Sequence, residues 1–115
     1  MLNINGVELE LDLMDAEVAE KYENAIKELD RKEKEKNTEG LSLAQVIRQE
    51  CSYVFDFFNE VWGEGTAKKV FGNKTNYNEC EKAFKDVVDY CKEEIERLKA
   101  RTAKYSSNRA DRRAN

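Results

Sequence analysis

The longest run of apolar side chains lies between residues 43 and 62 and repeats with the period of a helix. At roughly 100° per residue, these side chains fall in one sector about 200° wide, opposite a polar sector. A helix that covers one neighbour needs a stripe of only about 100°, so this helix is expected to contact two layers, or one layer and a second subunit. The sector contains Leu43, Val46, Ile47, Cys51, Tyr53, Val54, Phe55, Phe57, Phe58, Val61 and Trp62.

The first thirteen residues predict a β-hairpin. Asn5-Gly6 favours a type I′ turn, and apolar and polar residues then alternate strictly up to residue 13. A two-stranded hairpin is only marginally stable in water, so its apolar face must cover the helices or pair with a strand of another subunit. The residues of this face are Val7, Leu9, Leu11 and Leu13.

Capping residues and helical periodicity predict further helices. Asp15 is a suitable N-cap for a helix over about 15–36, and Ser42 with Gln45 matches a capping box at the start of the helix over about 42–62. Thr66 is expected to cap a short helix whose Val70 and Phe71 close one end of the core. A last helix over about 77–103 has apolar residues spaced by three and four.

These elements predict a mainly α fold, a small helical bundle with an N-terminal β-hairpin. We expect the two long helices, over about 42–62 and 77–103, to pack antiparallel, with the helix over about 15–36 as the third. The predicted domain covers residues 1–105, with the hairpin at 1–13. Residues 106–115 have no apolar side chain larger than Ala, so they are expected to form a disordered basic tail.

Glu50 interrupts the apolar sector of the central helix, between Ile47 and Val54. An unpaired carboxylate there would be costly, so three interpretations remain. Glu50 pairs with a Lys or Arg of another helix, it lies in a partly wet position near the hairpin, or it is a functional carboxylate. A lone Glu without a second acid, a His or a metal ligand is weak evidence for catalysis.

Composition narrows the classes of function. The 115 residues include no Pro, which favours helix, and a net charge of −4 argues against nucleic acid as the main partner. No run approaches the roughly 18 apolar residues of a membrane span, so no membrane association is expected. Three Cys and no His indicate free core thiols in a reducing cytoplasm. We find no metal or cofactor site and no catalytic constellation, and therefore expect no enzyme activity.

The central block VFDFFNEVWGEGTAKKVFGNKTN, the N-terminal ING hairpin and the ending SSNRADRRAN resemble a known group of small proteins. These proteins are encoded in the tail-morphogenesis region of phages and prophages of Gram-positive bacteria and are similar to tail assembly chaperones. The resemblance implies a non-enzymatic helical protein of the host bacterial cytoplasm. It also implies that the protein binds the tape-measure protein, or another tail protein, during tail morphogenesis.

Two groups of residues are candidates for partner binding. Asn108, Arg109, Arg112 and Arg113 lie in the basic ending, where the arginines would share one face of a helix and bind carboxylates of a partner. Phe57 and Trp62 are aromatic residues of the central helix. The wide apolar sector also predicts a homo-oligomer. The alternative function is that of a phage regulatory or anti-defence protein that inhibits a host protein by direct binding.

Overall fold

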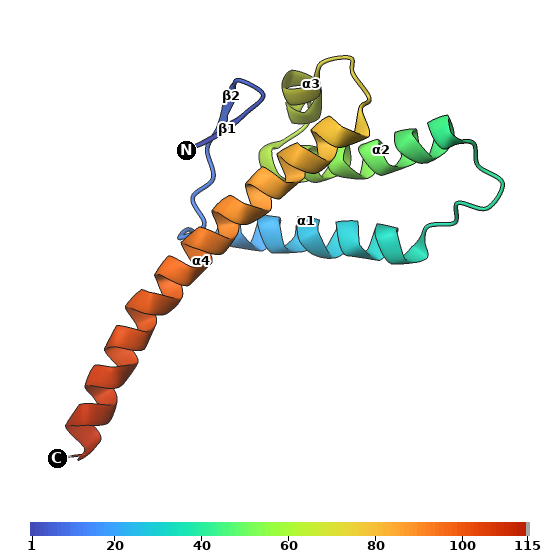
Figure 1. Cartoon of the computed structure of the whole chain (residues 1–115). Helices are drawn as coiled ribbons and strands as arrows, with labels where there is room; N and C mark the ends of the chain where they lie inside the picture. Colours follow the sequence, from blue (N-terminus) through green and yellow to red (C-terminus); the bar gives the residue numbers. More distant parts are fainter. Residues whose placement is uncertain (115) are drawn as a thin grey trace.

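The protein is mainly helical with an N-terminal hairpin, as predicted (Figure 1). The computed structural model describes the backbone of residues 1–114 and the side chains of residues 1–104. Its elements are β1 (Leu2–Ile4), β2 (Val7–Leu9), α1 (Ala16–Glu35), α2 (Leu43–Trp62), α3 (Thr66–Phe71) and α4 (Tyr77–Ala114).

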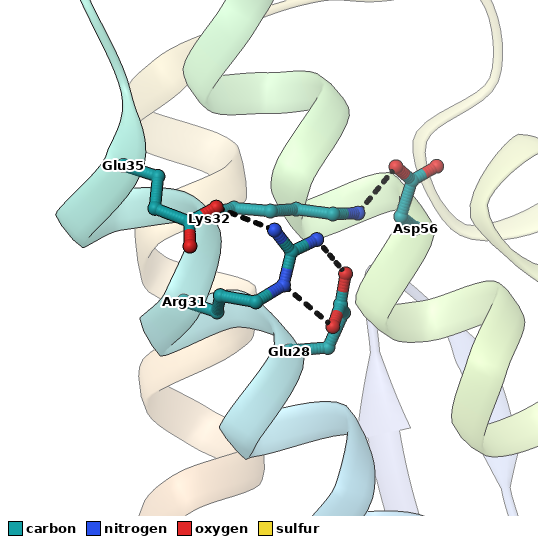
Figure 2. A network of polar contacts seen from close by, with 5 residues as sticks. All are labelled: Glu28, Arg31, Lys32, Glu35 and Asp56. Atoms are coloured by element: carbon teal, nitrogen blue, oxygen red, sulfur yellow. Dashed lines mark hydrogen bonds and ion pairs between the residues drawn. The ribbon is translucent and has the colours of Figure 1, made fainter.

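Helices α1 and α2 lie side by side and antiparallel (Figure 1). Two ion pairs join the end of α1 to α2: Lys32 Nζ lies 2.9 Å from Asp56 Oδ2, and Lys36 pairs with Glu50 in the first half of α2. Figure 2 shows the first of these pairs beside Arg31, which binds Glu28 and Glu35 within α1. These exposed pairs contribute little energy each, but they are consistent with a single register between the two helices.

The central helix begins and ends as its sequence predicts. Ser42 Oγ accepts from the backbone N–H of Gln45, and Gln45 Oε1 accepts from that of Ser42, which completes the capping box. At the start of α1, Asp15 accepts from the N–H groups of Glu17 and Val18. Each cap satisfies backbone donors that have no partner inside the helix, which explains why these boundaries follow from local sequence.

Thr66 is not the N-cap that was expected for α3. Gly65 occupies this position in the left-handed conformation, with φ of 92°, and Thr66 is the first helical residue. The Thr66 hydroxyl donates to the carbonyl of Gly63 instead, at 2.7 Å. Val70 and Phe71 are buried at the end of the core, as predicted.

The predicted direction of α4 relative to α2 is wrong. Cys51 lies next to Cys80 and raises its pKa, and Phe57 packs edge-on against Phe84 with ring centroids 5.1 Å apart. Residue numbers therefore increase together along the contact, so α2 and α4 run in the same general sense. The antiparallel partner of α2 is α1. The segment 63–76, which includes α3, carries the chain back along α2 before α4 begins (Figure 1).

The N-terminal hairpin covers the core within the same chain. Asn5 and Gly6 have φ of 52° and 79°, as the type I′ turn requires, and Leu2 pairs with Leu9. Asn5 Nδ2 donates to the carbonyl of Val70 at 3.2 Å, which fixes the turn beside α3. Of the two predicted roles of the hairpin, the structure therefore contains the cover over the helices of the same chain.

Beyond β2 the chain stays attached to the helices although the strand ends at Leu9. Trp62 Nε1 donates to the carbonyl of Glu10 at 2.7 Å, and Tyr90 Oη donates to the carbonyl of Leu11 at 3.3 Å. These two aromatic side chains thus provide hydrogen-bond donors for two backbone carbonyl groups that follow the end of the strand.

Helix α4 continues to Ala114, past the expected end near residue 103. Residues 106–114, which were expected to be disordered, thus have a helical backbone. No Gly or Pro follows Gly72, so the sequence contains nothing that forces the helix to end. The second half of α4 projects away from the rest of the domain (Figure 1). With this helix included, the longest dimension of the chain is 67 Å.

The three cysteines are free and buried, as predicted: Cys51, Cys80 and Cys91. Burial raises the pKa of Cys80 to about 12 and that of Cys91 to about 11, and the neighbouring Cys51 adds to the shift of Cys80. Because the thiolate is the nucleophile, buried thiols with raised pKa values react poorly.

We therefore expect the native protein to show no fast reaction with 5,5′-dithiobis(2-nitrobenzoic acid) at pH 8. In guanidinium chloride, three thiols per chain should react. Free cysteine, measured in both buffers, controls for the effect of denaturant on the reagent. A native thiol that reacts as fast as free cysteine would contradict the closed core described above.

Candidate functional site

An open groove of about 770 Å³ lies at the end of the domain where α1 and α2 extend beyond the start of α4. Near the start of α4, Cys80 lies next to Cys51 in the third turn of α2, and the apolar residues in the first two turns of α2 are less covered than those that follow. The lining residues are Leu29, Glu33, Lys36, Leu43, Val46, Ile47, Glu50, Val54, Thr75, Asn76, Tyr77, Asn78, Glu81 and Phe84.

The walls of the groove are the uncovered part of the apolar sector of α2. Leu43 is 77% exposed, and Val46 and Ile47 are only half-buried. Further along the same helix, Val54 and Phe58 are buried. The second layer that the 200° sector predicted is thus present from Cys51 onward and incomplete over the first two turns of α2.

Carboxyl groups from three helices line the groove: Glu33 of α1, Glu50 of α2 and Glu81 of α4. Lys36 Nζ lies 2.7 Å from Glu33 Oε2 and 2.5 Å from Glu50 Oε1. The side chain of Glu50 is 14% exposed, so the carboxylate in the apolar sector is paired with a lysine from the end of another helix. This confirms the first of the three interpretations of Glu50.

The two carboxyl groups that share Lys36 differ in acidity. Burial and a hydrogen bond with Glu33 raise the pKa of Glu50 above its ordinary value, and Lys36 opposes this shift only in part. Burial also acts to raise the pKa of Glu33, but its hydrogen bonds with Glu50 and Lys36 lower it overall. The hydrogen bonds that Lys36 donates to Glu33 and Glu50 raise the pKa of Lys36, so the lysine stays charged. The local charge of these three groups is therefore negative when both carboxyls ionise.

Lys36→Gln should destabilise the domain by about 1 kcal/mol at pH 7, because Glu33 and Glu50 then face each other without a cation. The loss should shrink as the pH falls, since protonated carboxyls gain nothing from Lys36. Urea unfolding of both proteins at pH 7 and pH 4 measures this. A second variant with Lys36→Gln and Glu50→Gln should recover most of the loss at pH 7. An equal loss at both pH values would show that the lysine acts through its alkyl chain alone.

Of the residues predicted for partner binding, the side chains of Phe57 and Trp62 are among those that the structure describes. Phe57 is 2% exposed and packs against Tyr22, Phe58 and Phe84, so it is a core residue and offers no surface to a partner. Trp62 is half-buried and holds the chain after the hairpin. The side chains of Asn108, Arg109, Arg112 and Arg113 lie outside those that the structure describes.

Sequence reasoning identified Glu50 but missed the groove as a whole. The only signal was the width of the apolar sector, which showed that α2 needed a second layer without showing which part would lack it. Leu43, Tyr77 and Glu81 come from segments whose proximity depends on where α4 starts along α2.

Among the described residues, no group of three or more Cys, Asp or Glu side chains is arranged to hold a metal ion. Within the same part of the chain, no helix combines the length and apolar composition needed to cross a membrane.

The fold and the groove define a small helical domain with a hairpin over its core and an apolar groove with carboxyl groups at one end. The chain belongs to a family of unknown function, DUF6673, which it matches over residues 5–115. Neither the curated proteins nor the solved structures contain a significant match to this chain.

Proposed function

We propose that this protein is a non-enzymatic assembly chaperone that holds an apolar helix of a protein partner in the groove between α1, α2 and α4. The observation that carries the proposal is the incomplete second layer over the first two turns of α2. An apolar helix face that a folded domain leaves open is a common site for a partner helix, which buries the same surface that a third helix would have covered.

The resemblance of the central block and of the ending SSNRADRRAN to phage tail assembly chaperones suggests the partner. On this proposal the partner is the tape-measure protein of a phage tail, whose long apolar helices need cover in the host bacterial cytoplasm until the tail assembles. The groove offers Leu43, Val46 and Ile47 to such a helix. A non-enzymatic role is also consistent with the thiols, which are buried, and with Glu33 and Glu50, which share one lysine.

Co-expression with the tape-measure protein of the same phage or prophage tests this function. We expect the wild-type protein to raise the soluble fraction of the tape-measure protein at least fivefold. Leu43→Glu should remove most of this gain without unfolding the domain, because Leu43 is 77% exposed. Leu98→Glu is the matched control, since Leu98 is an exposed leucine on α4 outside the groove.

Two outcomes would overturn the proposal. In the first, the wild-type protein leaves the solubility of the tape-measure protein unchanged. In the second, Leu43→Glu and Leu98→Glu have the same effect, which would show that the groove is not the contact.

A further inference from the structure

We infer that the groove selects an amphipathic helix that carries a Lys or Arg within its apolar face. This inference rests on the proposed function, because it names the chemistry of the partner that the groove accepts. It follows from the charges that the three walls of the groove present together.

The charged groups of the groove do not balance. The lining contains three carboxyl groups, Glu33, Glu50 and Glu81, and one cation, Lys36. Lys36 is already engaged by Glu33 and Glu50, and Glu81 lies one turn after Tyr77 on α4 and raises the pKa of that tyrosine. The lining therefore contains more carboxyl groups than cations, and the groove carries net negative charge beside its apolar walls when these carboxyls ionise.

A neutral apolar helix in the groove would leave this charge imbalance in place and make it more costly. It would cover Leu43, Val46 and Ile47, and at the same time it would remove water from carboxylates that have no second cation. The cost of the lost hydration would then oppose the gain from apolar burial. A helix with one basic residue would avoid this cost, because an ammonium or guanidinium group forms charge-assisted hydrogen bonds with carboxylates.

The placement of the carboxyl groups indicates where the basic residue would lie. Glu33, Glu50 and Glu81 come from three different helices around one groove, so a single cation at its centre can approach more than one of them. Apolar side chains of the partner at spacings of three and four would then contact the walls on either side. The selected sequence is thus an apolar helical stripe interrupted once by Lys or Arg.

Two synthetic peptides test this inference with the full-length protein. Each is an amphipathic Ala/Leu helix of about 16 residues, long enough to be partly helical alone, and the two differ only by Lys or Gln at one position in the apolar face. Isothermal titration calorimetry at 50 mM and 500 mM NaCl should give at least tenfold tighter binding of the Lys peptide at low salt. The preference should shrink at high salt, since screening weakens the charge interaction.

Variants of the protein locate the effect. Glu50→Gln and Glu81→Gln should each reduce the preference for the Lys peptide several-fold, whereas Glu93→Gln, an exposed position on α4 outside the groove, should leave it unchanged. Glu81 is exposed, so its variant remains informative even if Glu50→Gln lowers stability. Circular dichroism of each variant checks that the domain is folded.

The outcomes separate this inference from the proposed function. Equal affinity for the two peptides, or a preference that survives both Glu→Gln changes, would overturn the inference and leave the groove as a site for apolar helices. No binding of either peptide at millimolar concentration would overturn both the inference and the assignment of the groove.

Discussion

Phe58→Ala should lower the free energy of unfolding by about 3–5 kcal/mol, a large part of the stability of a domain of this size. Phe58 is 0% exposed, and its ring lies 5.3 Å from those of Trp62 and Phe71 and 5.8 Å from that of Phe57, measured between centroids. Truncation would leave a cavity between α2 and α3 that these rigid rings cannot fill. Urea unfolding followed by circular dichroism measures the change.

Glu60→Ala is the control for this substitution, because Glu60 is exposed on the same helix. Its effect should stay within about 0.5 kcal/mol. A loss below about 1 kcal/mol for Phe58→Ala would show that α2 presents a different face to the core.

Ile4→Ala should cost about 2–5 kcal/mol, because the hairpin is part of the core. Ile4 is 2% exposed, and Leu2 and Leu9 are buried beside it across the two strands. The hairpin also joins the helices through Asn5 and the carbonyl of Val70. Thermal or urea unfolding of the variant should therefore show one cooperative transition at lower denaturant, and no separate loss of the strands.

Glu8→Ala, at an exposed position on the same hairpin, should change the stability by no more than about 0.5 kcal/mol. Unfolding midpoints measured over a hundredfold range of protein concentration provide a second test. A hairpin that pairs with a strand of another subunit would make the midpoint depend on concentration, whereas an intramolecular lid would not.

Local features of the sequence predicted the elements and most of their ends. Asp15 and Ser42 cap the helices that they were expected to cap, and Asn5-Gly6 forms the expected turn. Each of these depends on hydrogen bonds or φ angles within a few residues, so distant parts of the chain cannot change them much. The exceptions among the ends are the start of α3, where Gly65 and not Thr66 is the N-cap, and the end of α4, where neither Gly nor Pro marks a stop and the helix continues to Ala114.

Features that depend on the relative placement of helices were predicted less well. The period of α2 identified its apolar sector, but Phe57 was expected to contact a partner and lies in the core. The direction of α4 was also predicted wrongly, since the short α3 returns the chain along α2 instead of reversing it once. A hydrophobic pattern specifies which side of a helix is apolar and contains no information about the direction of the helix that covers it.

The sequence by itself thus determined the helices, the hairpin, the caps at Asp15 and Ser42 and the need of α2 for a second layer. Only the tertiary structure decided that this layer begins near Cys51 and leaves Leu43, Val46 and Ile47 in an open groove. It also decided that Lys36 is the partner of Glu50. The physical reason is that caps and turns depend on neighbouring residues. The groove and its charges depend instead on how three helices from different parts of the chain pack together.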